Sequence, residues 1–122
     1  MTTPDAVLVP NLSGLELEPH EQEIYDQPVQ IRLLHEDDTT GAEHYLVRYP
    51  AGMEPAWHTH TVAHTFVILE GSMRANGQLL GPGSYAHFPA GTPMRHGPAD
   101  GDCLFVVIFH GPFDVALTDA PA

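Results

Sequence analysis

From residue 29 onward, short runs rich in apolar, β-branched and aromatic residues alternate with clusters of Gly, Pro, Asn and Asp. Runs of this kind, bounded by turn-forming residues, are typical of β-strands. The predicted strands are 29–35, 43–49, 56–60, 64–70, 72–75, 78–80, 84–88, 103–110 and 113–117. The pattern has no convincing helical period. Many short strands with closely spaced turns therefore predict an all-β antiparallel sandwich or barrel.

Residues 1–28 have a different pattern, in which prolines and acidic residues separate short apolar pieces. Proline removes a backbone donor and fixes φ, so regular structure is hard to sustain there. Several apolar residues nevertheless argue against a fully disordered tail: Val7, Leu8, Val9, Leu12, Leu15 and Leu17. We expect an N-terminal arm of residues 1–28, packed over the domain of residues 29–122 or against a neighbouring subunit.

Length and charge limit the classes of function. A chain of 122 residues fits one domain with a single core. Four basic residues stand against 16 acidic ones, which gives a formal net charge of −12. Such a surface repels nucleic acid phosphates and anionic lipid headgroups, so neither partner is expected. The chain also lacks an uninterrupted apolar run of roughly 18 residues, the minimum for a membrane-spanning helix.

The single cysteine, Cys103, excludes an internal disulfide framework and fits a reducing compartment. It lies inside an apolar run and is interpreted as a small core residue. The N-terminus lacks a basic region followed by an apolar stretch, so the sequence shows no secretory signal. We expect a cytoplasmic protein.

Nine histidines are the most informative excess in the composition, because histidine is the commonest metal ligand. Alternation along a strand directs His58 and His60 to the same face. His64 follows a short bend and faces the same interior if its strand pairs back on its predecessor. Imidazoles gathered inside a barrel repel one another when protonated and are poorly solvated when neutral, and a metal ion resolves both problems. The alternative is an exposed strand whose histidines bond to water or backbone.

Two segments around these histidines resemble the sequence motifs of cupins. The first is Gly52-Met-Glu-Pro-Ala-Trp-His58-Thr-His60, with a Leu-Glu-Gly that closes the next strand. The second is Gly83-Ser-Tyr-Ala-His-Phe-Pro89-Ala-Gly91, continuing to His96. The resemblance covers about residues 32–115. It implies a double-stranded β-helix, the cupin jelly-roll barrel, with metal ligands from both motifs.

Within this resemblance, the candidate metal ligands are His58, His60, His64 and His96. Two departures from the cupin pattern concern the last two. Many cupins place glutamate where this chain has His64. The usual spacing would put the final histidine at Met94, but it follows two residues later, and Pro93 indicates a bend that would restore His96 to the site.

Two groups of cupins are similar in detail. The string Met94-Arg-His96-Gly97, with Gly-Pro-Phe after the long apolar strand, is similar to the ending of three-histidine β-diketone-cleaving dioxygenases, and Leu-Leu-His at 33–35 adds a weaker similarity. The string Asp100-Gly-Asp-Cys103 is similar to cupin domains of zinc-binding anti-sigma factors, which usually keep the glutamate that this chain lacks.

Neutral imidazoles leave a divalent metal with its full charge, which favours an anionic chelating substrate such as an enol deprotonated between two carbonyls. Arg95, beside His96, is a candidate to orient a substrate oxygen, with an exposed salt bridge as its alternative. Candidate pocket walls, which could equally be core, are Trp57, Phe66, Ile68, Phe88, Met94 and Phe105. No role is expected for the remaining strand histidines, of which His87 should face outward: His35, His44, His87 and His110.

These observations favour a metal-dependent cupin enzyme, a dioxygenase acting on a small dicarbonyl or hydroxyketone. Imidazole suits several metals, and iron is expected for an enzyme, with zinc or nickel as alternatives. The reaction rests on the resemblance, and one fold hosts many functions. The alternatives are a non-enzymatic metal or small-ligand binder with a regulatory role, and a cupin isomerase or lyase. A homodimer is expected, because symmetric dimers are the commonest assemblies.

Overall fold

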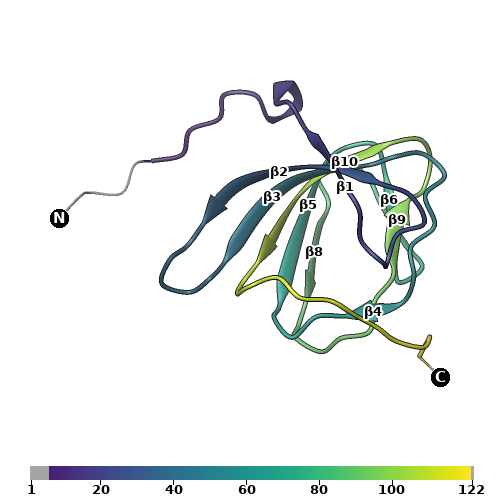
Figure 1. Ribbon diagram of the computed structural model, residues 1–122. Coiled ribbons are helices and arrows are strands. Elements are labelled where there is room, and N and C mark those ends of the chain that lie inside the picture. Colours follow the sequence, from purple (N-terminus) through teal and green to yellow (C-terminus); the bar gives the residue numbers. More distant parts are fainter. Residues whose placement is uncertain (1–5, 122) are drawn as a thin grey trace.

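The computed structural model describes residues 6–121, whose strands form three antiparallel sheets. The large sheet has the order β1-β2-β3-β10-β5-β8, and the smaller ones are β7-β6-β9 and β11-β4. The strands are β1 Glu18–His20, β2 Val29–Glu36, β3 Glu43–Tyr49, β4 His58–Thr59, β5 His64–Glu70, β6 Met73–Ala75, β7 Gln78–Leu80, β8 Tyr85–Phe88, β9 His96–Pro98, β10 Cys103–Phe109 and β11 Ala116–Leu117. Figure 1 shows the large sheet curving round one side of a barrel, with β6 and β9 opposite.

The prediction of an all-β protein is confirmed. The single helical element between residues 6 and 121 is a 3-10 turn, η1 (Leu12–Gly14). Within the same range, no helix has the length and apolar character needed to cross a membrane.

Strand β10 organises the large sheet, because it pairs with β3 on one side and β5 on the other. Its inward side chains, Phe105, Val107 and Phe109, are buried, while the residues between them are half-buried. This is the period of two that an extended strand imposes. Phe109 lies directly opposite His64 on β5. Because directly opposite residues share a face, the register brings His64 into the barrel with the core.

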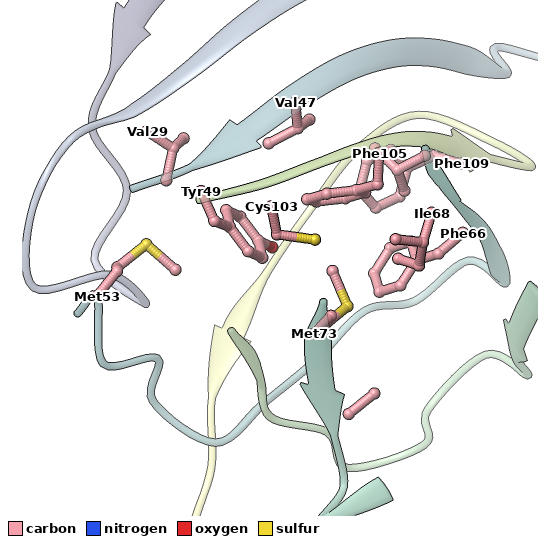
Figure 2. Packing of buried hydrophobic residues seen from close by; sticks show 12 residues of the cluster. Val29, Val47, Tyr49, Met53, Phe66, Ile68, Met73, Cys103, Phe105 and Phe109 are labelled. Atoms are coloured by element: carbon pink, nitrogen blue, oxygen red, sulfur yellow. The ribbon is translucent and has the colours of Figure 1, made fainter. Parts of the chain in front are cut away.

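The core fills the space between the large sheet and β6. Figure 2 shows Tyr49, Cys103 and Met73 gathered there, and all three are almost completely buried. The Phe105 ring packs edge-on against Tyr49 and Phe66, with centroids 4.7 Å and 5.2 Å away. Full burial of a large apolar side chain contributes roughly 1.5–3 kcal/mol. These rings therefore form a packed layer, in which Phe66 and Tyr49 lie against His96.

The strand predictions were accurate where the apolar runs have clear turn residues at their ends. Strands Glu43–Tyr49, His64–Glu70 and Gln78–Leu80 have the predicted bounds. The predicted strands 56–60 and 113–117 are shorter, at His58–Thr59 and Ala116–Leu117. Strand β9 was not predicted, because Pro93 and the Gly-Pro pair at 97–98 interrupt the pattern there.

Regular structure, which the prolines of residues 1–28 were expected to disfavour, forms at β1. This strand pairs antiparallel with β2, and it forms one edge of the large sheet. After β1 the chain crosses toward the barrel, where Ile24 is buried and its carbonyl accepts a 2.8 Å hydrogen bond from the Ala56 N–H. Tyr25 forms an isolated β-bridge with Pro55. The second half of the arm is therefore fastened to the barrel at both ends.

Candidate metal centre

Backbone pairing brings the two histidine segments together. The N–H and carbonyl groups of His58 and Met94 exchange two hydrogen bonds of 2.9 Å each. Beyond Met94 the chain enters β9, where His96 lies opposite Ala75 of β6. The carbonyl of His60 accepts a 2.8 Å hydrogen bond from the Gly91 N–H. Residues separated by nearly forty positions are thus held side by side, and the late position of His96 is accommodated by the segment that carries Met94.

Three imidazoles converge at this place. One ligand atom from each of His58, His60 and His96 lies within 4.8 Å of the other two, and all three side chains are buried. The Nε2 atoms of His58 and His96 are 3.2 Å apart. At this spacing, the three nitrogens could bind one divalent ion together.

His64 lies beside the cluster. Its ring centroid is 4.7 Å from that of His60 and 6.3 Å from that of His96. It stacks on Phe88, with the ring planes 19° apart. Within residues 6–121, its Nδ1 and Nε2 are both buried and neither has a hydrogen-bond partner. A buried polar group without a partner costs roughly 1–3 kcal/mol. A metal ion bound to one nitrogen of this ring would offset part of that cost.

Hydrogen bonds at Nδ1 of His58 and His60 determine which nitrogen of each ring is free to bind a metal ion. His58 Nδ1 is 2.8 Å from the carbonyl oxygen of Ala56, and His60 Nδ1 contacts the carbonyl oxygen of Asp114. A carbonyl only accepts, so Nδ1 carries the proton in each neutral ring. The lone pair is then on Nε2, as a metal ligand requires. Backbone partners of this kind also fix the ring orientation.

A pair of tyrosines supports the third ring. Tyr49 Oη is 2.8 Å from His96 Nδ1 and 2.8 Å from Tyr25 Oη. Burial raises the pKa of Tyr25 to about 12 and holds that of Tyr49 well above its ordinary value, so both hydroxyls keep their protons at neutral pH. The Tyr49 hydroxyl can therefore accept from His96 while donating to Tyr25. The chain of three groups connects the arm to the histidine cluster.

Burial also keeps the histidines neutral. Desolvation lowers the pKa of His58 to about 4, against a smaller opposing effect of its bond to Ala56. For His64, desolvation and the neighbouring histidines lower the pKa to about 3. Desolvation also lowers the pKa of His60 and His96. Neutral imidazole is the form that binds metal, so the cluster is ready to coordinate without losing protons at pH 7.

Three of the four histidines line a cavity of about 80 Å³. His60, His64 and His96 contribute to its wall, and most of the rest is apolar. The apolar wall comprises Ile24, Val29, Ile31, Val47, Phe66, Phe105, Val107, Phe109 and Phe113. No aspartate or glutamate is among the described residues that line it. Besides Ile24, the arm supplies His20, Gln22 and Tyr25.

Two side chains expected near a substrate lie outside this cavity. The Arg95 side chain is exposed, and its guanidinium lies 5.4 Å above the Trp57 ring. Each is the sequence neighbour of an inward histidine, His96 and His58, so strand alternation directs it to the outer face. Arg95 therefore packs on Trp57 as a cation–π pair, and neither side chain lines the cavity.

The other candidate walls divide between cavity and core. Phe66 and Phe105 line the cavity, while Phe88 stacks on His64. Ile68 and Met94 are buried but are not among the lining residues. The outer histidines, His35, His44, His87 and His110, are also not among them, and His87 is exposed as expected.

The sequence analysis did not identify the tyrosine that bonds to the cluster or the arm residues that line the cavity. Tyr49 shares the parity of Val47 in β3, so alternation alone could have placed it inside. The arm residues His20, Gln22 and Tyr25 gave no comparable signal. They occur between prolines, where periodicity is lost.

The barrel topology and the three-histidine cluster together define a small cupin. A family model described as the ChrR cupin-like domain matches residues 18–114. The chain therefore belongs to this family. No curated protein sequence matches the chain.

Solved structures with the same fold have different activities. Acetylacetone dioxygenase from Acinetobacter johnsonii is 19% identical, with a TM-score of 0.76 over 98% of this chain and 80% of that one. The polyketide cyclase RemF from Streptomyces resistomycificus is 17% identical, with a TM-score of 0.74 over 99% and 88%. The anti-sigma factor ChrR of Rhodobacter sphaeroides, solved in complex with SigE, is 17% identical, with a TM-score of 0.65 over 82% and 52%. At these identities the likeness establishes the fold.

Proposed function

We propose that this cupin is a metal-dependent dioxygenase for a small dicarbonyl or hydroxyketone, with the metal held by His58, His60, His96 and His64. The observation that carries the proposal is the pair of buried, unpartnered nitrogens of His64 beside the three-histidine cluster. Within residues 6–121, neither nitrogen has a hydrogen-bond partner, and an ion shared with the cluster would bind the lone pair of one of them. Iron is the metal expected for this reaction, with zinc and nickel as alternatives.

The residues favour an enolate as the bound form of the substrate. Neutral histidines bring no negative charge, and the described wall of the cavity has no carboxylate to repel an anion. A divalent ion bound there would supply Lewis-acid charge that polarises two neighbouring oxygens of the substrate. The phenylalanines exclude water around the reacting carbons and strengthen this electrostatic effect. Support for the reaction itself comes from the likeness to acetylacetone dioxygenases.

The test is dioxygen uptake by iron-loaded protein given a panel of β-diketones and hydroxyketones. Wild-type protein should consume dioxygen with at least one member, and His58→Ala should abolish uptake. His35→Ala, which removes a histidine outside the cavity, is the matched control and should retain uptake. Uptake by none of the substrates, with iron bound, would reject the dioxygenase.

A regulatory metal-binding module is the second candidate. It is favoured by the family model and by the likeness to ChrR, which is solved together with SigE. Tight zinc binding without turnover on any substrate would support this function. A cupin isomerase or lyase stays as a third alternative, because one fold hosts many functions. For the assembly we retain the prediction of a homodimer, which sedimentation at equilibrium would test.

A further inference from the structure

The cavity has a second polar end, formed by the arm. His20 and Gln22 line the same cavity as the metal-centre histidines. His20 lies directly opposite Val29 in the β1–β2 pair, and Val29 is a buried core residue that also lines the cavity. Residues directly opposite in an antiparallel pair share a face. The register therefore directs His20 into the barrel.

The two polar side chains are arranged to leave donors and an acceptor free. The Gln22 amide nitrogen lies 3.2 Å from His20 Nε2, where it can only donate. His20 Nε2 then accepts, so Nδ1 carries the proton of the neutral ring and is a donor. The Gln22 amide retains one N–H and its carbonyl oxygen. A hydroxyl or ketone oxygen could bond with this pair.

The surroundings disfavour a charged group at this end. The same segment carries the exposed acidic residues Glu18, Glu21 and Glu23, and the chain has a net charge of −12. An anion entering beside the arm is repelled, whereas a neutral oxygen is not. Between the two ends, the described wall is formed by aliphatic and aromatic side chains.

We propose that His20 and Gln22 bind a neutral oxygen-bearing tail of the substrate, while the histidine cluster holds its chelating head. This inference rests on the proposed function and specifies its substrate class. The ligand is a small molecule with a 1,3-dicarbonyl head, a short apolar body, and a hydroxyl or ketone at the far end. His20 and Gln22 are specificity-determining residues, and the chemical step does not involve them.

The experiment measures binding to zinc-loaded protein by calorimetry, so no turnover is needed. Three ligand series share the 1,3-dicarbonyl head and end in methyl, hydroxyl or carboxylate, each over a range of tail lengths. At one length the hydroxyl ligand should bind about tenfold tighter than the methyl ligand, as expected for one or two neutral hydrogen bonds. The carboxylate ligand should bind more weakly than the hydroxyl ligand.

Variants assign the preference to the arm. His20→Leu and Gln22→Met should each remove most of the preference for hydroxyl while leaving the affinity for the methyl ligand almost unchanged. His35→Leu and Gln27→Met change the same residue types outside the cavity and should keep the preference. Circular dichroism confirms that each variant is folded, and Gln22→Met alone suffices if His20→Leu unfolds.

The outcomes separate this inference from the function on which it rests. If methyl and hydroxyl ligands bind wild-type protein equally, or if His20→Leu and Gln22→Met keep the preference, the second polar end is rejected and the dioxygenase stands. If no ligand of any series binds the zinc-loaded protein, the proposed function fails, and the inference with it.

Discussion

Histidines on the two faces of the large sheet differ in what their surroundings allow. His64 on β5 is buried toward the interior, whereas the hydroxyl of Thr65, the next residue on β5, lies 2.9 Å from both His87 Nδ1 and His110 Nε2 on the outer face. The outer rings find a hydroxyl and solvent, but the inner ring finds no partner among residues 6–121. The face of the sheet thus separates ordinary surface histidines from the candidate metal site, and residue type alone does not.

The largest expected effect comes from removing a central ligand. His96→Ala should weaken zinc affinity by more than about 100-fold, because loss of a direct ligand exceeds the 10–100-fold typical of its supporting partners. Competition with a chromophoric chelator measures the affinity. His87→Ala is the control on the outer face and should bind zinc as the wild type does. Equal losses of zinc affinity in His96→Ala and His87→Ala would show that the inner histidines do not differ from the outer ones in metal binding.

Acid should destabilise the metal-free protein through the inner face. The pKa of His58 is lowered to about 4 and that of His64 to about 3, both below the unfolded value of about 6.5. Between the folded and unfolded pKa values, the unfolded chain binds more protons than the folded one. The contribution of these histidines to the free energy of unfolding is therefore fully present above about pH 6.5, and it is lost as the pH falls toward 4 for His58 and toward 3 for His64. Each such histidine contributes a slope of up to about 1.4 kcal/mol per pH unit. Urea unfolding across this range measures the slope, and a flat profile would contradict burial as neutral rings.

His64→Leu should separate stability from metal binding. Leucine removes two buried nitrogens without partners, so the metal-free variant should gain about 1–3 kcal/mol in its free energy of unfolding. In the presence of zinc, the wild type should recover at least part of this difference, because the stability gained from zinc rises with affinity and the variant keeps three ligands instead of four. Thermal unfolding with and without zinc tests both parts. A variant that loses stability in both conditions would show that His64 is mainly a packing residue.

Tyr49→Phe should have the smallest of these effects. It removes the hydroxyl that partners His96 Nδ1 while keeping the ring that packs on Phe105. Zinc affinity should fall about tenfold, the lower part of the range for such partners. Tyr45→Phe, on the same strand but without a bond to His96, is the matched control. Unchanged affinity in Tyr49→Phe would show that the hydroxyl does not orient the ring.

The sequence was sufficient for features that depend on local alternation. The bounds of β3 and β5 followed from it, as did the shared face of His58 and His60. It was insufficient where pairing across long distances decides the outcome. Strand β9 forms because it pairs with β6, despite its Gly-Pro pair. The outward position of Arg95 could be predicted only once that strand was known. The arm residues at the cavity also depend on tertiary packing, which leaves no period to detect.

The position of β1 has a consequence for solubility. It is an outer strand of the large sheet, and its central residue, Pro19, has no N–H to offer an incoming strand. The exposed carboxylate of Glu18 adds charge to the same edge. Edges that end in proline and charge resist growth by strand addition. The same segment that contributes His20 to the cavity therefore also protects this edge of the sheet against edge-to-edge aggregation.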